Sequence, residues 1–458
     1  MRLTILGGGG FRVPLVHRAL SHGRYAGLIT ELTLHDTDPD RLQAIANVLR
    51  AMEAKDPQAA HPQLSTTTDL DQALTGADVV FAAIRTDGVE GRVKDERVAL
   101  DHGLIGQETV GAGGVSYALR SIPQMLHIAR RLKELNPHAW LINFTNPAGM
   151  VTEALQQVLG SGVIGICDSP IGLVRRAARA ARIPASASLR GVDYVGLNHL
   201  GWLRGLEHDG VNQLPALLAD ERKLSTFEEG RLFGPRLLRV LGTVPNEYLF
   251  YYYFRSEATR ALTGASQTRG EYIARQQDEL YKQLAAAGDG SGSGSDSDAY
   301  RLWDEARRSR EDGYLAEARP EDEQRDESDL DGGGYEEVAL SVMNAVLTDT
   351  RTSLILNVRN GSTIACLPTS AVIEAPSTVD ASGAGPLPVG PLTLHQRGLM
   401  TQLKDVEAST IRAVTNADRD AALYAFAFHP LVDSANLAEK LLSAYEQEFP
   451  ELEDLWRS

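Results

Sequence analysis

The chain begins with a short apolar segment, MRLTIL, that runs directly into four glycines at positions 7–10. A strand ending in a glycine-rich turn, with a helix starting near Val13, lets the backbone approach a pyrophosphate and points helix amides at it. Arg12 stands where a third glycine is usual, so the fingerprint is incomplete. We nevertheless predict a dinucleotide site, and its residues are Gly7, Gly9, Phe11 and Arg12.

A second apolar segment, at residues 32–36, ends in Asp36. At the end of the second strand of a dinucleotide-binding fold, a carboxylate accepts hydrogen bonds from the ribose hydroxyls and favours NAD over NADP. Asp36 could instead cap the helix that we expect to begin near Pro39. We predict the ribose role, and therefore NAD as the cofactor.

Further strand-like segments, at 77–83 and 139–144, alternate with helical ones such as 121–135. This alternation predicts an α/β fold with an N-terminal Rossmann-like, doubly wound parallel sheet. We place that domain at residues 1–195. A second, mixed α/β (α+β) domain should occupy residues 196–458, and its helices, which we expect at 393–416 and 419–426, should return to the domain interface.

Composition narrows the class of protein. A chain of 458 residues, 43% of them hydrophobic, can bury a large core. No segment approaches the ~20 apolar residues of a membrane span, and no cleavage signal follows the first strand. The net charge of −16 argues against nucleic acid, which is bound by basic surfaces. Two distant cysteines argue against a disulfide framework, so we expect a cytoplasmic protein without a membrane partner.

Residues near 288–330 have a biased composition. Glycine-serine repeats at 290–295 precede acidic clusters such as 321–323, and apolar residues are few beyond Tyr300, Leu302 and Trp303. This composition predicts a mobile acidic surface insertion. An inert loop and a lid over the active site are both open interpretations of it.

Cys167, Asp168 and His199 carry the most distinctive chemistry in the middle of the chain. Cys167 is one of only two cysteines and is followed directly by Asp168, and His199 follows further along in an Asn-His pair. A thiolate, a carboxylate and an imidazole are all metal-ligand types. The pattern therefore predicts a metal site, with a buried apolar thiol and a core histidine as the alternatives.

Several motifs occur in an order that resembles glycoside hydrolase family 4. Behind the glycine-rich first strand come GQET (106–109), NFTNPAG (143–149), ICDSPIG (166–172), LNHLGW (197–202), NEYLFY (246–251) and TRG (268–270). The resemblance covers nearly the whole chain apart from the acidic insertion. It implies an NAD-dependent glycoside hydrolase, which is an exception to hydrolysis by two carboxylates.

The resemblance also implies a mechanism: NAD-dependent oxidation at C3 of the sugar, deprotonation at C2, and elimination at C1. Water then adds to the unsaturated intermediate and the hydride returns to C3, so there is no net redox change. Cys167 and His199 match the family's ligands for a divalent metal, commonly Mn²⁺. Tyr248 matches the base at C2, and a phenol needs a nearby cation to act as a base at neutral pH. Packing within a tyrosine cluster is the alternative for Tyr248.

Substrate contacts follow from the same resemblance. Arg92, Asn146 and Arg269 match the family's substrate-binding residues, and the bidentate geometry of arginine suits a phosphate. The alternatives are surface ion pairs for the two arginines and a turn residue before Pro147 for Asn146. Asp168 matches the residue that protonates the leaving oxygen in relatives acting on α-linked phosphorylated sugars, although it could only orient a neighbour. The segment GGGYEEVAL (332–340) resembles a branch of 6-phospho-β-glucosidases, and on this basis we favour the β anomer.

The expected function is hydrolysis of 6-phospho-β-glucosides, such as cellobiose 6-phosphate, to glucose 6-phosphate and an aglycone, by a homodimer or homotetramer. Two alternatives are open. One is a 6-phospho-α-glucosidase with the same mechanism. The other is an NAD-dependent 2-hydroxyacid dehydrogenase, because the first domain resembles that group, but such enzymes ordinarily lack a metal-ligand cysteine at the position of Cys167.

Overall fold

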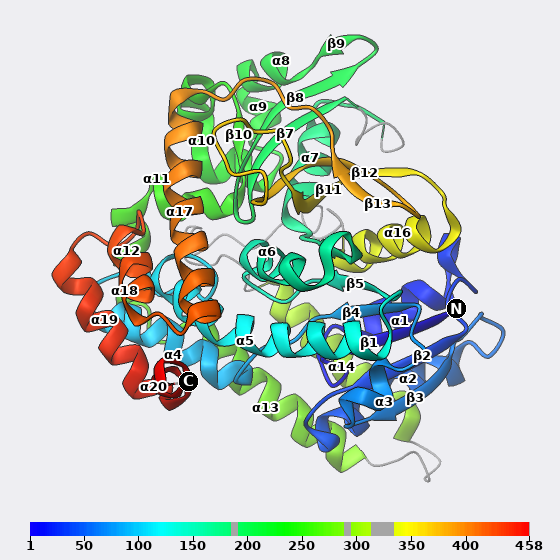
Figure 1. Cartoon of the computed structure of the whole chain (residues 1–458). Coiled ribbons are helices and arrows are strands. Elements are labelled where there is room, and N and C mark those ends of the chain that lie inside the picture. The colour runs from blue at the N-terminus through cyan, green and yellow to red at the C-terminus, as the bar shows by residue number, and fades with distance from the viewer. Residues whose placement is uncertain (185–190, 288–294, 313–333, 458) are drawn as a thin grey trace.

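The structure is a computed structural model that describes residues 1–184, 191–287, 295–312 and 334–457 (Figure 1). Within these residues one mixed sheet of 13 strands passes through the molecule, and helices cover it. The order along the sheet is β10-β8-β7-β12-β11-β6-β5-β4-β1-β2-β3, with β13 beside β12 and β9 beside β8. The two halves of the chain therefore share one sheet.

The N-terminal half contributes the parallel part of the sheet, in the order β3-β2-β1-β4-β5-β6. Its strands are β1 (Arg2–Leu6), β2 (Glu31–His35), β3 (Gln63–Thr67), β4 (Val79–Ala82), β5 (Trp140–Asn143) and β6 (Val163–Gly165). The strand order reverses at β1, as in a doubly wound fold, which confirms the predicted Rossmann-like sheet. Strand β3 was not predicted, because its residues, QLSTT, are mostly polar and largely exposed at the sheet edge.

Successive residues of the central strands point into two different cores, because side chains alternate across a strand. Val79 and Phe81 of β4 join the core on one face, and Val80 and Ala82 join the core on the other. The helices of this half are α1 (Val13–Ser21), α2 (Pro39–Lys55), α3 (Leu70–Leu74), α4 (Gly88–Asp101), α5 (Gly111–Leu135), α6 (Ala148–Leu159) and α7 (Ser169–Ala180).

The second half extends the same sheet with antiparallel strands. They are β7 (Val192–Leu197), β8 (Leu200–His208), β9 (Val211–Asn212), β10 (Val244–Pro245), β11 (Thr352–Arg359), β12 (Val372–Asp380) and β13 (Gly383–Pro386). The junction is a pairing of Asn357 on β11 with Gly165 on β6. Strand β7 spans the position between residues 195 and 196 at which we place the domain boundary, and the boundary itself stays a prediction.

Helices of the second half surround this extension. They are α8 (Leu214–Ala219), α9 (Glu221–Leu224), α10 (Glu228–Leu241), α11 (Phe250–Tyr253), α12 (Arg255–Gly264), α13 (Arg269–Ala287), α14 (Ser295–Asp312), α16 (Tyr335–Thr348), α17 (Leu394–Asn416), α18 (Arg419–Phe428), α19 (Ala435–Glu448) and α20 (Pro450–Arg457). The predicted helices at 393–416 and 419–426 are confirmed as α17 and α18. A capping box between Thr393 and Gln396 starts α17. Helix α17 contacts both α5 and β7, so it joins the two halves (Figure 1).

Residues 295–312 correct the prediction of a mobile insertion. They form α14, which packs on α2, and the side chain of Trp303 is only 1% exposed. The Trp303 indole donates a hydrogen bond of 2.8 Å to the carbonyl of Phe11 in the glycine turn. Ala299, Trp303 and Ala306 recur at helical spacing, so one face of α14 is apolar despite its polar composition. The rest of the predicted insertion, at 288–294 and 313–330, lies outside the described residues.

Replacing Trp303 by alanine should lower the free energy of unfolding by about 3–5 kcal/mol, the usual cost of truncating a buried tryptophan. Arg301 of the same helix is exposed and pairs with Glu305, so Arg301→Ala is the matched control and should change stability by less than about 0.5 kcal/mol. Urea denaturation followed by circular dichroism compares the two. Equal stabilities would contradict the packing of α14.

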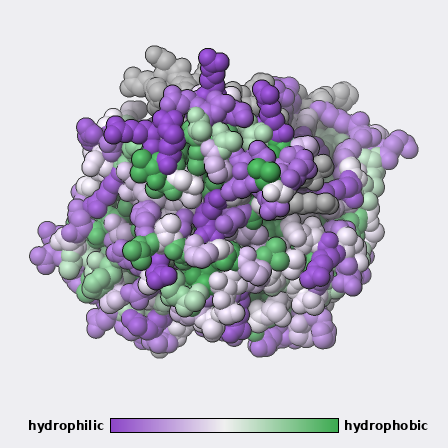
Figure 2. Space-filling model, turned by 90° about the horizontal axis from the view of Figure 1, so that it is seen from above, coloured by the Kyte–Doolittle hydropathy of each residue, from purple (hydrophilic) through white to green (hydrophobic). Residues whose placement is uncertain are grey.

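The surface is mainly hydrophilic on the face seen in Figure 2, where hydrophobic groups form small patches among polar ones. The most exposed large hydrophobic side chains of the described residues are Leu394 (83%) and Val240 (79%), so neither side chain belongs to the hydrophobic core. Among the residues that the structure describes, no helix is both long enough and apolar enough to cross a bilayer.

Candidate active site

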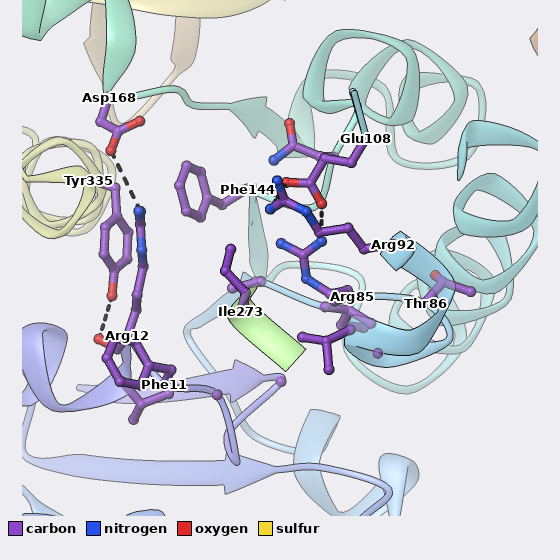
Figure 3. A pocket seen from close by; sticks show the side chains of 18 of the residues that line it. Phe11, Arg12, Arg85, Thr86, Arg92, Glu108, Phe144, Asp168, Ile273 and Tyr335 are labelled. Atoms are coloured by element: carbon purple, nitrogen blue, oxygen red, sulfur yellow. Dashed lines mark hydrogen bonds and ion pairs between the residues drawn. The ribbon is translucent and has the colours of Figure 1, made fainter. Parts of the chain in front are cut away.

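A cavity of about 1770 Å³ opens at the carboxyl ends of the parallel strands (Figure 3). This edge, at the reversal of the strand order, is where ligands bind in open α/β sheets. The cavity exceeds the roughly 300–1,000 Å³ of a typical small-ligand pocket, so it can take a dinucleotide and a second molecule together. It is lined by the glycine turn, by the connection after β6, and by residues of α4, α13, α14 and α16.

The glycine turn after β1 needs glycine for two reasons. Gly7 has a φ of +85°, and a Cβ there would lie 2.6 Å from the carbonyl oxygen of Ala83. The amide of Gly9 donates a hydrogen bond of 2.9 Å to the carboxylate of Asp36. Helix α1 begins at Val13, directly after the turn. The turn and the predicted ribose acceptor thus lie together at one end of the cavity.

Asp36 does not cap α2, so that alternative interpretation is wrong. The cap is Asp38, whose carboxylate accepts hydrogen bonds from the amides of Asp40 and Arg41 at 3.0 Å each. Asp36 instead lines the cavity while it holds the Gly9 amide. Its position is compatible with the ribose role, which stays a prediction.

Cys167 and His199 come together from separate elements. The sulfur lies 3.8 Å from Nε2 of His199, and both residues are buried. Burial lowers the pKa of His199 to about 4, so its imidazole is neutral at pH 7, which is the metal-binding form. Burial and the charges of Glu374 and Asp168 raise the pKa of Cys167, so a bound cation is required to make it a thiolate. A soft sulfur and a neutral nitrogen on the cavity wall fit a divalent transition metal.

Tyr248 lies directly against this pair. Its ring stacks on that of His199, with centroids 3.8 Å apart and planes 12° apart. The short helix η4 (Glu247–Leu249) carries it, and Asn246 fixes that helix by accepting the Tyr248 amide and donating to Ser169. A cation held by Cys167 and His199 would therefore lie close to the phenol.

Asp168 reaches the cavity but is not free there. Its carboxylate forms an ion pair of 3.6 Å with Arg12, one of the predicted cofactor residues (Figure 3). Tyr335 supports Arg12, since its hydroxyl donates to the Arg12 carbonyl at 2.5 Å and its ring lies under the guanidinium. Tyr335 in turn stacks on Phe144. A role of Asp168 as a proton donor would require the ion pair with Arg12 to open.

Arg92 lies in a buried cluster of charges at the other side of the cavity. It donates to Glu96 and to Glu108, in both cases at 2.7 Å, and Glu108 also pairs with Arg85 (Figure 3). Burial would raise the pKa of Glu108, but Arg85 and Arg92 lower it to about 2. No role was predicted for Arg85 or Glu108. Glu108 could have been found, because it lies in the GQET motif, whereas no motif marks Arg85.

Asn146 and Arg269 line the same cavity. The side-chain oxygen of Asn146 accepts the amide of Ala148 at 3.3 Å, so it also shapes the turn before α6. Arg269 begins α13 and donates to the carbonyl of Arg310 in α14 at 2.7 Å. The three predicted substrate residues thus come from distant segments and face one space.

A buried polar layer beneath Cys167 was not predicted. Glu374 of β12 is 1% exposed and accepts hydrogen bonds from Tyr194, Asn198 and Asn357. Burial raises its pKa to about 7 despite these bonds. A glutamate inside the apolar segment VIEA is the only sequence signal for it. Through Asn198 this layer positions the turn that carries His199.

Comparison with known proteins identifies the family. Residues 2–183 match the family 4 glycosyl hydrolases, and residues 194–432 match the C-terminal domain of the same family. The chain belongs to glycosyl hydrolase family 4. This confirms the resemblance inferred from the motifs and excludes the 2-hydroxyacid dehydrogenases as its family.

The relatives of this family 4 glycosyl hydrolase include proteins named as 6-phospho-α-glucosidases and proteins named as 6-phospho-β-glucosidases. A Bacillus subtilis protein named "Probable 6-phospho-beta-glucosidase" is 31% identical over 96% of the chain and 94% of its own length. The "6-phospho-alpha-glucosidase 1" of Lacticaseibacillus paracasei is 28% identical over 98% of both chains. The names alone therefore do not distinguish the anomers for this chain.

Solved structures share the fold over the full length. A 6-phospho-alpha-glucosidase from gut microorganisms, in complex with NAD and glucose-6-phosphate, is 25% identical with a TM-score of 0.79, and the match covers 99% of this chain and 98% of that one. The 6-phospho-beta glucosidase of Thermotoga maritima, with NAD and glucose-6-phosphate, has a TM-score of 0.81 at 23% identity over 99% of both chains.

Proposed function

We propose that this family 4 glycosyl hydrolase is a 6-phospho-β-glucosidase that depends on NAD and a divalent metal and acts on substrates such as cellobiose 6-phosphate.

 The observation that carries the proposal is the Cys167–His199 pair, stacked against Tyr248, in the same cavity as the glycine turn. Relatives named as 6-phospho-glucosidases, and similar structures solved with NAD, Mn²⁺ and glucose-6-phosphate, support the substrate class and both cofactors.

The glycine turn would hold the dinucleotide. The Gly7 to Gly9 backbone and the start of α1 suit the pyrophosphate, and Asp36 suits the ribose hydroxyls. Phe11 and Arg12 complete this end of the cavity. Bound NAD supplies a reversible hydride acceptor for C3 of the sugar, and a bound divalent ion, commonly Mn²⁺, supplies an electrophile for its hydroxyl oxygens.

Cys167 and His199 would hold the metal with one sulfur and one nitrogen, which leaves further positions for oxygens of the sugar. The phenol oxygen of Tyr248 would take the proton from C2, because its ring lies against the metal-binding imidazole. Arg92, Asn146 and Arg269 would bind the phosphorylated end of the substrate. In this scheme the chain's residues orient the sugar and move one proton.

The β anomer is supported by the GGGYEEVAL segment and by the relative that is 31% identical. The α anomer is the second candidate, because Asp168 lies on the cavity wall where a carboxyl group could protonate a leaving oxygen. The ion pair with Arg12 counts against this role, since it engages the carboxylate.

The decisive test is hydrolysis of the p-nitrophenyl α- and β-glucoside 6-phosphates, with NAD and Mn²⁺ each present or omitted. We expect nitrophenol release from the β substrate only when both cofactors are present, without net NADH, because the hydride returns to C3. Faster hydrolysis of the α substrate would assign Asp168 the acid role. Net NADH without nitrophenol would overturn the proposal in favour of a dehydrogenase.

Assembly and location are part of the same proposal. We propose a homodimer or homotetramer, as the family resemblance implies, and light scattering after size exclusion would measure its mass. A cytoplasmic location suits the two cysteines, both of which are free, and detection of the protein outside the cytoplasm by cell fractionation would contradict it.

A further inference from the structure

Arg310 lies in the last turn of α14 and lines the active-site cavity, although no motif includes it. Its guanidinium carbon is 5.0 Å from the centroid of the Phe11 ring, so the side chain reaches over the glycine turn. Helix α14 is the part of the predicted acidic insertion that proved to be packed.

Three side chains of α13 donate hydrogen bonds to backbone carbonyls near the end of α14. Arg269 donates to the carbonyl of Arg310 at 2.7 Å, Tyr272 donates to the carbonyl of Ser309 at 3.2 Å, and Gln276 donates to that of Ala306 at 3.1 Å. The position of Arg310 is therefore tied to Arg269, which we propose as a phosphate ligand. The two guanidinium groups enter the cavity from adjoining helices.

Among the residues that the structure describes, no carboxylate forms an ion pair with Arg310, although its charge helps to lower the pKa of Glu108. Its neighbours on α14, Arg307 and Arg308, both pair with Asp304. Across the cavity, Arg85 and Arg92 share Glu108.

More cations than anions surround Arg310, since Glu108 is already paired with Arg85 and Arg92. Burial, and then the charges of Arg12, Arg85, Arg92 and Arg269, lower the pKa of Arg310 well below its ordinary value. A half-buried cation among other cations is costly unless an anion joins it. The cavity at this point is therefore built for a ligand that carries negative charge.

We propose that Arg310 binds the 6-phosphate of the substrate together with Arg269, and that α14 thereby contributes to the preference for phosphorylated sugars. This inference rests on the proposed function and adds a residue to it. A phosphate dianion offers three oxygens, which suits two arginines that approach from adjoining helices. The dinucleotide pyrophosphate is the other phosphate source, but the glycine turn and the start of α1 already suit it.

Arg310→Gln tests the proposal in the enzyme supplied with NAD and Mn²⁺. We expect the KM for the p-nitrophenyl β-glucoside 6-phosphate, and the inhibition constants of glucose 6-phosphate and inorganic phosphate, to rise roughly 10- to 100-fold, the usual effect of losing hydrogen bonds between charged groups. The Kd for NAD should stay within about twofold, since Arg310 would not touch the dinucleotide. Arg301→Gln, on the exposed side of α14, is the matched control and should leave all these constants unchanged.

Thermal melting of both variants checks that α14 remains folded, and Arg310→Lys, which keeps the charge but loses the bidentate geometry, should restore part of the phosphate affinity. Unchanged phosphate inhibition in Arg310→Gln would overturn the inference while the wild-type activity upholds the proposed function. A loss of NAD affinity alone would assign Arg310 to the pyrophosphate and also overturn it. A wild-type enzyme that neither hydrolyses nor binds phosphorylated glucosides would instead defeat the proposed function itself.

Discussion

Cys167→Ala should reduce turnover of the phosphorylated glucoside by roughly 10³-fold or more, because removing a ligand forfeits several kcal/mol of charge stabilisation by the metal. Of the two side chains that come within 3.8 Å of each other to form the proposed metal site, only His199 would remain. The affinity for NAD should change little, since the glycine turn and Asp36 are separate from this pair. Turnover as a function of Mn²⁺ concentration, metal content of the purified protein, and NAD binding measure the three effects.

The chain provides its own control for that experiment. Cys366 is the other free cysteine and is exposed, so Cys366→Ala should leave turnover and metal content unchanged. Chelation of the wild-type enzyme should imitate Cys167→Ala, and added Mn²⁺ should reverse chelation but not the substitution. Full Mn²⁺-dependent turnover in Cys167→Ala would remove the thiol from the metal site.

Tyr248→Phe should abolish exchange of the C2 hydrogen with solvent deuterium and lower kcat by roughly 10²- to 10⁴-fold, the usual contribution of a general base. The substitution removes one oxygen and keeps the ring that stacks on His199 at 3.8 Å. The metal site should therefore stay intact, and the KM should change less than kcat. Nuclear magnetic resonance of substrate incubated in deuterated buffer measures the exchange directly.

Tyr253→Phe is the control for the base assignment. The hydroxyl of Tyr253 accepts a hydrogen bond from Trp202 and contacts His395 instead of the cavity, so its loss should leave exchange at C2 unaffected. Normal exchange in Tyr248→Phe would assign the base to another residue. Equal losses in both variants would indicate a general effect on the tyrosine-rich segment, and would likewise reject Tyr248 as the base.

Local sequence patterns predicted those parts of the fold that depend on interactions between residues close together in the chain. The glycine turn, the strands at 79–82 and 140–143, and the helices α17 and α18 all follow from glycine, apolar periodicity and capping residues. Strand β3 was missed because its stability comes from pairing with β2 rather than from apolar side chains of its own. Helix α14 was not predicted, because the composition of its segment is mainly polar and acidic. Its short apolar face is recognised only from its packing against α2.

The sequence by itself determined the family, the class of fold and the set of chemically capable residues, because ordered motifs and periodicity are properties of the chain. Only the tertiary structure decided how those residues meet. It places Tyr248 on His199, engages Asp168 with Arg12, and brings Arg310 beside Arg269. The physical reason is that these contacts join segments far apart in the chain, so they depend on strand order and helix packing, which no local pattern records.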